Sequence, residues 1–329
     1  MKIRTIILLA LTGFILASCE RTLNIDTPEH ETKLVINAVQ EPGKPFVVNV
    51  SRSYSVPTSL QYEDLFVKDA EVEIWEDGAL LSTLTYRDTL VEEYWQWRQG
   101  EQPDLLLGQY QNDDELRVEP GKNYELRVNH AELGKVIATT QTTEQAIPDS
   151  FSLELDAISE TDLDGYVYKN HVARIYITDT PGEENYYSIQ LQGVYPIPGD
   201  TSFRDTFPFY NNGRLVSYTA NSAELDSDFW ASDAGADGQQ LKLEYMVSGG
   251  AGTVFVDNEE ITVEPIELIL TFYTANADAY RYLNGLDKQS RSDPTNPFFP
   301  SEAIVVPGNI DGGYGAFGSK SEVVLKKKF

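Results

Sequence analysis

Apolar and polar residues alternate with a period of two in several short segments, and this alternation limits the possible folds of the chain more than any other feature. In Ala70–Ile74 and Tyr124–Val128, apolar side chains alternate with charged ones. Phe46–Val50 has a similar pattern. Because successive side chains of a strand point to opposite faces, each segment is predicted to be a half-buried strand of an antiparallel sheet.

Turn signals divide the first half of the chain into short strands. The sequence Glu-Pro-Gly-Lys occurs twice, at residues 41–44 and 119–122. Proline at the second position and glycine at the third favour a type II turn. Residues 33 to about 143 are therefore predicted to hold seven or eight strands, which would pack as a β-sandwich of immunoglobulin-like or transthyretin-like type.

The second half is predicted to be a separate β-rich domain. Gln145–Ser150, which contains Pro148, has the composition of a boundary. The segment Ile266–Tyr273 is apolar on both faces, which predicts a central strand covered on both sides. Residues 196–238 are rich in Gly, Asp, Asn and aromatic residues and are predicted to form long loops. Four further strands are predicted at Phe151–Ile158, Val172–Thr178, Tyr186–Gly193 and Leu241–Val247.

One helix is predicted after this central strand. Asn276 can cap it, and Asp278 suits the positive end of the helix dipole. Ala279, Leu283 and Leu286 recur at helical spacing. The predicted fold class is thus mainly β: a sandwich domain in residues 33–146, then a second antiparallel β domain with one short helix in residues 147–329.

The N-terminus has the features of a lipoprotein signal peptide. Lys2 and Arg4 precede the apolar stretch Ile6–Leu16, which is shorter than the roughly 20 residues that span a bilayer. Leu16-Ala17-Ser18-Cys19 resembles a lipobox, the sequence at which bacterial lipoproteins are lipidated on cysteine and cleaved before it. We therefore expect residues 1–18 to be removed, Cys19 to carry lipid, and residues 19–32 to form a polar tether.

Two consequences follow from the cysteine count and the charge. Cys19 is the only cysteine, so the folded body cannot contain a disulfide. The chain has 25 basic and 52 acidic residues, a formal charge of −27, and loss of Lys2 and Arg4 makes it −29. Such a surface repels phosphate backbones, so we expect no nucleic-acid partner. Solubility, a basic partner, or cations bound in clefts would each account for the charge.

Motifs for catalysis are missing from the sequence. His30-Glu31 lacks the second histidine of a zinc protease motif, and there is no Gly-x-Ser-x-Gly sequence. Carboxylates are so numerous that no glycosidase pair can be chosen from the sequence. We therefore expect a protein that is not an enzyme.

Two clusters are candidate binding residues. Asp226, Asp228, Asp233 and Asp237 offer oxygen ligands of the kind that calcium prefers, although their spacing differs from the twelve-residue calcium loop, and a solvated acidic loop is the alternative.

The second cluster is aromatic. Trp95 and Trp97 would share one face of a strand, where exposed rings could stack on sugars or anchor a protein interface. Alternatively, both rings pack into the sandwich core.

Several segments resemble one known family along almost the whole chain. Cys19-Glu20 and Asp26-Thr27-Pro28 precede Lys33–Asn37, and further matches are Asp69–Ile74, Tyr280–Leu283, Asp293-Pro294, Asn296–Phe298 and Asn309–Gly318. The last of these, Asn-Ile-Asp-Gly-Gly-Tyr-Gly-Ala-Phe-Gly, is the most specific. On these residues the chain resembles the Bacteroidota outer-membrane lipoproteins that carry domain of unknown function 4249.

The resemblance implies residence in the outer membrane and, because such proteins are often encoded near TonB-dependent receptors, an accessory role for a β-barrel receptor or transporter. It implies no catalytic residues. The leading hypothesis is therefore a lipid-anchored accessory subunit without enzyme activity. A glycan-binding surface lipoprotein and a carboxylate-dependent hydrolase are the alternatives. The side of the outer membrane that the body faces is left open.

Overall fold

The structure is a computed structural model that describes residues 30–55, 62–90, 106–113, 115–161, 167–197, 200–218, 230–249, 252–256, 259–263, 265–291 and 304–328. The elements discussed below belong to one compact unit, Thr32–Ser53 and Leu60–Phe329. As predicted, the protein is mainly β with a single α-helix among the described residues. The signal peptide, Cys19, Trp95 and Trp97 lie outside the described residues.

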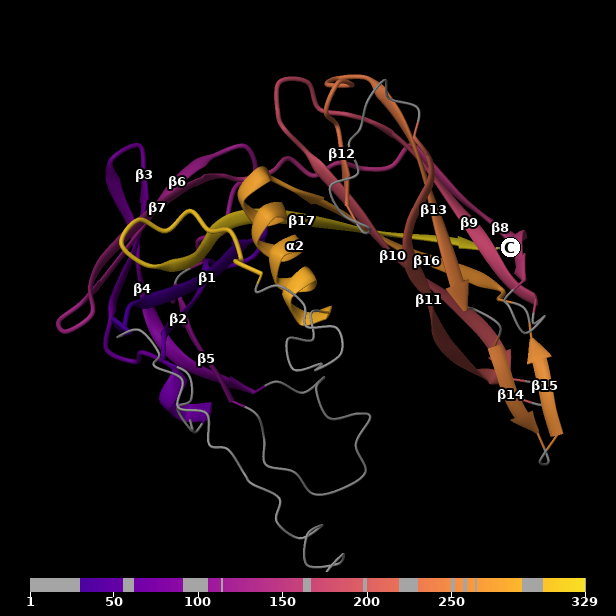
Figure 1. Ribbon diagram of the computed structural model, residues 1–329, viewed down its shortest axis with the longest axis horizontal. Helices are drawn as coiled ribbons and strands as arrows, with labels where there is room; N and C mark the ends of the chain where they lie inside the picture. The colour runs from indigo at the N-terminus through magenta and orange to yellow at the C-terminus, as the bar shows by residue number, and fades with distance from the viewer. Residues whose placement is uncertain are drawn as a thin grey trace, which may run out of the picture. The chain divides into compact units, whose positions relative to one another are not determined.

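Seven strands and one 3₁₀ helix occupy the described part of the first half (Figure 1). Hydrogen bonds link the strands in the order β7-β6-β3-β4-β5-β2-β1. The alternation seen in the sequence is therefore a strand pattern, as predicted. The elements are β1 (Leu34–Gln40), β2 (Val47–Arg52), η1 (Tyr62–Leu65), β3 (Glu71–Glu76), β4 (Ala79–Leu90), β5 (Leu106–Gln111), β6 (Asn123–His130) and β7 (Gly134–Gln141).

Strand β4 connects two groups of strands around one hydrophobic core. Its first half, residues 79–84, pairs with β3, and its second half, residues 85–90, pairs with β5. The core takes side chains from both groups, with Ile36 on β1 and Ile74 on β3 fully buried. Phe46 and Tyr124 meet edge to face in this core, with ring centroids 5.0 Å apart.

Both Glu-Pro-Gly-Lys segments have the backbone that a type II turn requires. Gly43 and Gly121, each at the third position, have φ angles of 83° and 70°. The Lys44 N–H donates to the Glu41 carbonyl at 3.0 Å and closes the first turn. The prediction of the two turns is confirmed, because glycine alone adopts these angles without strain.

The second half contains the remaining strands and a second core. Hydrogen bonds give the order β17-β16-β10-β11-β13-β9-β8, with β14 and β15 as a separate hairpin. Tyr187, Leu243, Leu270 and Phe272 are among its fully buried core residues. The strands are β8 (Ser150–Thr161), β9 (Val167–Thr178), β10 (Tyr186–Ile197), β11 (Asp200–Tyr218), β12 (Ala231–Ser232), β13 (Gln240–Gly249), β14 (Gly252–Val256), β15 (Glu259–Val263), β16 (Glu267–Ala275) and β17 (Tyr314–Lys328).

The prediction of long loops in residues 196–238 is wrong for much of that range. Residues 200–218 form β11, which pairs with β10 on one side and with β13 on the other. The pairing with β13 shifts in register between Asn211 and Arg214. Asn212 and Gly213 lie at this irregularity inside the strand. They interrupt the period of two, and such residues are typical of loops, so the segment was predicted to be a loop.

The predicted central strand is present, but its two faces are covered differently. Strand β16 pairs with β10 and β17, so it is internal in the sheet. Leu268, Leu270 and Phe272 are buried on one face, whereas Ile269 and Thr271 on the other are half-buried.

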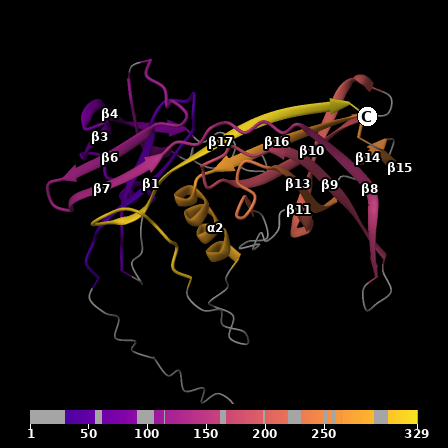
Figure 2. The same ribbon diagram turned by 90° about the horizontal axis from the view of Figure 1, so that it is seen from above.

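Strand β17 joins the two cores. Its first residues, Tyr314–Ser319, run parallel to Val35–Gln40 of β1, and Lys320–Lys328 run antiparallel to β16. Figure 2 shows β17 as one long ribbon that passes from β1 to β16. Phe317 on this strand is buried in the first core. The boundary between residues 146 and 147 stays a prediction, because a segment from beyond residue 300 completes the first core.

The glycines of the Asn309–Gly318 segment lie where β17 approaches other backbones. Gly315 has a φ of 95°, and a Cβ there would meet the Ile36 carbonyl oxygen at 1.8 Å. A Cβ on Gly308 would meet the Gly315 carbonyl oxygen at 2.0 Å. Asn309 holds the segment as well, because its Oδ1 accepts from the Phe317 N–H at 2.9 Å. The most specific segment of the chain therefore has a structural explanation.

Asn276 caps the helix α2 (Ala277–Arg291), as predicted. Its Oδ1 accepts from the Ala279 N–H at 3.0 Å and from the Ser319 N–H at 3.1 Å. Its Nδ2 donates to Thr140 Oγ1 at 2.8 Å and to the Gln141 carbonyl at 2.7 Å. One side chain thus joins α2, β17 and β7.

Candidate functional site

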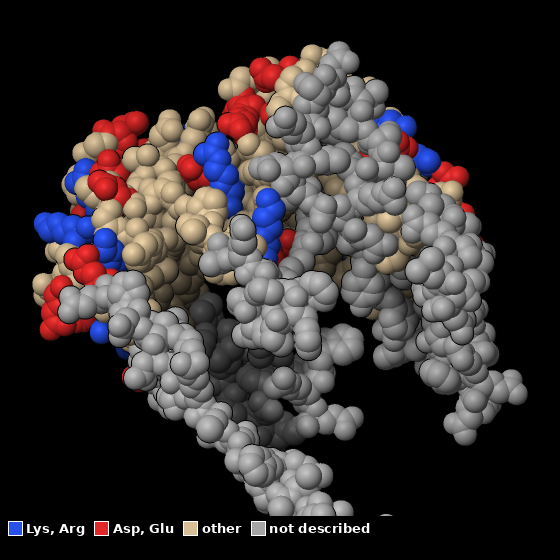
Figure 3. All heavy atoms as spheres, in the orientation of Figure 1, with Lys and Arg blue, Asp and Glu red and all other residues tan. Residues whose placement is uncertain are grey.

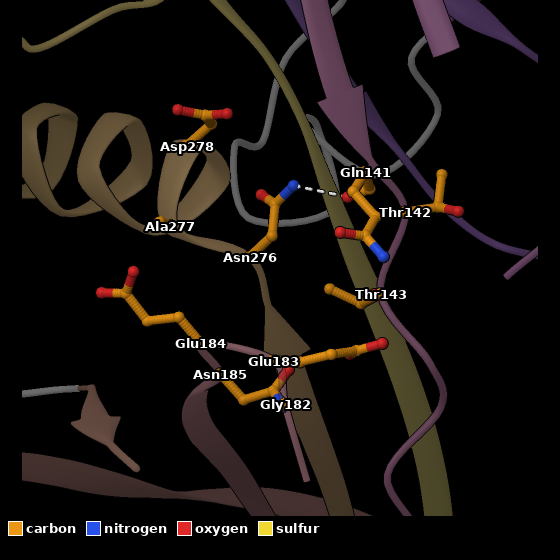
Figure 4. Close-up of a pocket in the computed structure, with 10 residues that line it drawn as sticks. All are labelled: Gln141, Thr142, Thr143, Gly182, Glu183, Glu184, Asn185, Asn276, Ala277 and Asp278. Carbon is orange, nitrogen blue, oxygen red and sulfur yellow. Dashed lines mark hydrogen bonds between the residues drawn. The ribbon is translucent and has the colours of Figure 1, made fainter. Parts of the chain in front are cut away.

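A cavity of about 230 Å³ opens beside the first turn of α2 (Figure 4). Three separate stretches of the chain line it. They are Gln141–Thr143 at the end of β7, Gly182–Asn185 before β10, and Asn276–Asp278 at the start of α2.

The loop before β10 is held by three aspartates, of which Asp179 and Asp233 are buried and Asp237 is exposed. The Asn185 N–H donates to Asp233 Oδ2 at 2.8 Å, and the Gly182 N–H donates to Asp237 Oδ1 at 2.6 Å. Asp179 accepts from the Tyr187 hydroxyl and, at 2.8 Å, from the Gly238 N–H. Gly182 has a φ of 86°, which lets the chain turn directly before the lining residues. The loop is held at both ends by side chain to backbone hydrogen bonds.

The opposite wall is fixed by β17 and α2. The Thr143 N–H donates to Ser319 Oγ at 3.0 Å, and Ser319 is fully buried. Figure 4 shows the hydrogen bond from Asn276 to the Gln141 backbone across this side of the cavity. Groups in such a frame need little ordering when they bind a ligand, which lowers the cost of binding.

Carboxyl groups dominate the chemistry of the cavity. Burial raises the pKa of Glu183, and the charges of Glu144 and Asp179 raise it further, while a hydrogen bond from the Glu144 backbone opposes them. Burial also raises the pKa of Asp278, against the effect of Arg281 and of a hydrogen bond from Asn309. Glu184 accepts a hydrogen bond from the Tyr186 hydroxyl. A cation, Arg281, opposes the rise in the pKa of Asp278, whereas the causes of the rise at Glu183 include no cation.

Asn185 adds a buried amide to the lining. The residue is 3% exposed, and its backbone N–H and carbonyl both bond to Asp233. A carboxamide can both donate and accept. Together with three carboxylates, it gives the cavity the chemistry to hold a cationic group that carries N–H donors, such as an ammonium or a guanidinium.

The aspartates predicted to bind calcium are only partly described. Asp233 and Asp237 lie near the cavity and use an oxygen each to hold the loop before β10, while Asp226 and Asp228 lie outside the described residues. Burial raises the pKa of Asp233 to about 6, and the charge of Asp179 adds to this effect. Among the described residues no three His, Cys, Asp or Glu side chains gather in a way that could hold a metal ion. A calcium site formed by all four aspartates stays a prediction.

Two histidines have structural roles. Nδ1 of His130 accepts from the N–H groups of Glu132 and Leu133 at 3.2 and 3.1 Å, and Nε2 lies 3.1 Å from Asp69 Oδ1. Nδ1 of His171 accepts from the Asp156 N–H at 2.9 Å. These contacts hold the turn after β6 and the strand irregularity near Asp156. Neither histidine is among the residues that line the cavity.

Sequence reasoning missed the carboxylates of the cavity. A signal is present in Pro181-Gly182-Glu183-Glu184-Asn185, where a turn is followed by two acidic residues directly before a strand. Pairing this segment with the start of α2 requires the β10–β16 register, in which Tyr186 lies opposite Ala275. That register is not readable from the sequence. Trp95 and Trp97 remain candidates that no described contact tests.

Fold and cavity define a mainly β protein in which carboxylates from separate elements surround one opening. The chain belongs to the family described as Domain of unknown function (DUF4249), which matches residues 20–325. Comparison with curated proteins and with solved structures gave no match. In the described part of the chain, α2 is too short and too polar to cross a membrane, and no other helix there could do so.

Proposed function

We propose that this protein is a lipid-anchored accessory subunit without enzyme activity, and that it binds an outer-membrane receptor or transporter of the TonB-dependent class. The observation that carries the proposal is the cavity beside α2, where Glu183, Glu184 and Asp278 lie in a fixed frame with an acidic excess. An arrangement of this kind suits the capture of a basic group on a partner.

The charge of the whole chain supports a basic partner. The formal charge is −27, and Figure 3 shows acidic side chains with basic ones beside them on the described part of the face drawn. An acidic surface attracts a basic face over a distance of about 10 Å at 0.1 M salt and less at higher salt. Attraction of this kind brings the partners together, and the cavity then supplies specific contacts.

The N-terminal sequence supports confinement to a membrane. Leu16-Ala17-Ser18-Cys19 lies at the end of an apolar stretch, and the first described strand, β1, begins 15 positions after Cys19, at Leu34. Confinement to the same membrane raises the effective concentration of a receptor, so modest contacts suffice for a stable complex.

The proposal is tested by affinity purification of the lipidated protein from gently solubilised membranes, with quantification of every co-purified protein. We expect a β-barrel receptor at near-stoichiometric yield in low salt and a lower yield at high salt. The double variant Glu183→Gln, Glu184→Gln should reduce the yield. The matched control is Glu115→Gln, Glu132→Gln, which removes the same charge from exposed positions outside the cavity.

Two results would contradict the proposal. Recovery of the lipoprotein alone in several mild detergents at low salt would exclude a receptor complex. Equal loss of yield in both double variants would show that general charge, and not the cavity, governs binding. Glycan-dependent quenching of tryptophan fluorescence, or turnover that one carboxylate substitution abolishes, would instead support the glycan-binding or the hydrolase alternative.

A further inference from the structure

An apolar groove lies where the described body begins. Its volume is about 540 Å³, and it lies between α2 and the segment that leads into β17. Val35 on β1, Leu286 on α2, and Val305 and Tyr314 before and at the start of β17 are among its lining residues. The groove is separate from the cavity with the carboxylates, since the two have no lining residue in common.

Large apolar side chains are exposed at this groove. Val305 is 85% exposed, Tyr314 is 50% exposed and Leu286 is 36% exposed. Single exposed apolar residues are ordinary on protein surfaces, but several around one hollow mark a contact surface. The hydroxyl and ring of Tyr314, with Lys33 Nζ 5.9 Å from the ring centroid, give the edge of the groove both polar and apolar character.

The chain enters the body directly beside the groove. The Lys33 N–H donates to Ser53 Oγ at 3.0 Å, which fixes the entry point. In the parallel register of β1 and β17, Val35 lies opposite Tyr314. Lys33, the first residue after the tether, is thus two positions from Val35, which lines the groove.

We propose that this groove, with Val305, Tyr314 and Leu286 around it, is the surface by which the body rests on the lipid bilayer that holds its anchor. The inference rests on the proposed function in one respect, the lipid on Cys19. Lys33 lies 14 positions after Cys19, and this stretch spans at most about 50 Å when fully extended. The anchor therefore keeps the entry point of the tether, and the groove beside it, within reach of the bilayer.

Side-chain chemistry favours a bilayer interface as the occupant. Tyrosine is enriched where lipid meets water, because its ring is apolar and its hydroxyl is polar, and lysine extends its charge toward the water. Asp287 and Asp311 directly follow the lining residues Leu286 and Ile310 in sequence. Because their carboxylates would repel anionic lipid, the contact is expected with uncharged lipid. Uncharged phosphatidylcholine vesicles are thus a sufficient probe.

The test uses the lipidated full-length protein with a single introduced cysteine. Because Cys19 is the only natural cysteine and lipidation occupies its sulfur, Val305→Cys and Leu286→Cys each leave one reactive thiol. Val324→Cys is the matched control, because Val324 is 52% exposed but lies in the part of β17 that pairs with β16. Each variant is labelled with an environment-sensitive fluorophore and reconstituted into phosphatidylcholine vesicles that contain a spin-labelled lipid as quencher.

We expect a blue-shifted emission and at least a twofold stronger lipid quenching at positions 305 and 286 than at 324. Equal quenching at all three positions in protein that floats with the vesicles would overturn the inference and leave the lipid anchor intact. Failure of the protein to float would show that the anchor itself is wrong, and both proposals would fall. Shielding of position 305 by a receptor, with no quenching by lipid, would assign the groove to a protein partner and overturn the inference as well.

Discussion

At the scale of residues, the asparagines and glycines at the points where β17 meets other elements hold the fold together. Asn276 and Asn309 each hold the backbone of β17, at Ser319 and Phe317 respectively. Gly315 allows the same strand to approach β1. The capping role of Asn276 was predictable from its place before a helical pattern, but its bonds to β7 and β17 depend on contacts distant in sequence.

The first prediction concerns Asn276→Ala. Loss of a helix cap costs about 1 kcal/mol, and the buried N–H of Ser319 left without a partner costs about 1–3 kcal/mol more, so we expect a total loss of about 2–4 kcal/mol in the free energy of unfolding. Chemical denaturation measures it. Asn276→Asp keeps the acceptor and loses the donor, so it should be intermediate. Asn129→Ala, which removes a 3.3 Å bond to Glu71 on the surface, should change little.

The second prediction separates steric contact from backbone angle. Gly315→Ala places a Cβ 1.8 Å from the Ile36 carbonyl oxygen, whereas a Cβ on Gly43 meets nothing within 4 Å. Both glycines have positive φ angles, 95° and 83°. We expect Gly315→Ala to cost more than about 3 kcal/mol and Gly43→Ala about 1 kcal/mol. Similar losses in thermal or chemical unfolding would show that β1 and β17 do not approach as closely as described.

The third prediction is a pH dependence at Glu183. Burial raises the pKa of this carboxyl group in the folded state. A raised pKa contributes stability below the unfolded value of about 4.3, and the contribution is lost as the pH rises through the folded value. The stability of the natural protein relative to Glu183→Gln should therefore be greater at pH 4 than at pH 7. Melting temperatures of both proteins across this range provide the measurement, and a constant difference would contradict it.

At the scale of elements, regular alternation was sufficient to find strands but not to arrange them. Strands β3 and β6 alternate along their length, and both were predicted. Strand β11 was missed because Asn212 and Gly213 lie inside it and resemble a loop. The parallel pairing of β1 with β17 joins residues about 280 positions apart, and no local pattern carries that information. The carboxylates of the cavity were missed for the same reason.

The fourth prediction is that residues 33–146 alone do not fold cooperatively. Phe317 is buried in the first core, and Val35–Gln40 of β1 pairs with β17. Removal of the strand opens one edge of β1 and leaves a cavity in the core, which for a phenylalanine costs about 3–5 kcal/mol. We expect a fragment of residues 33–146 to show no cooperative melting transition in near-ultraviolet circular dichroism.

A second fragment makes this prediction specific. Residues 304–321, joined after residue 146 by a flexible linker, supply Asn309, Phe317 and the pairing partner of β1. We expect this fragment to regain a cooperative transition, and the same fragment with Phe317→Ala to lose it. Cooperative folding of residues 33–146 without the added strand would restore the boundary that the sequence predicts between residues 146 and 147.

At the scale of the whole molecule, charge and attachment act together. The two hydrophobic cores of the described residues form without disulfides, because no cysteine follows Cys19. The whole chain has a formal charge of −27, so a membrane that carries negative charge would repel its surface. The proposed membrane residence would therefore come from the N-terminal lipid, from the groove beside α2, from a partner, or from a combination of these.

The last prediction distinguishes these sources of membrane residence. Cys19→Ser removes the sulfur that would carry lipid. Each buried CH₂ group of an acyl chain contributes about 0.8 kcal/mol, so two or more chains hold a protein almost permanently, and their loss should release the body into the soluble fraction or leave the protein unprocessed. Detergent phase separation and membrane fractionation measure this change. Cys19→Ser protein that stays fully in the detergent phase would contradict lipidation at this residue. Loss from the detergent phase with retention on native membranes in low salt, but not in high salt, would instead show that electrostatic contact with a partner holds the body after the lipid is gone.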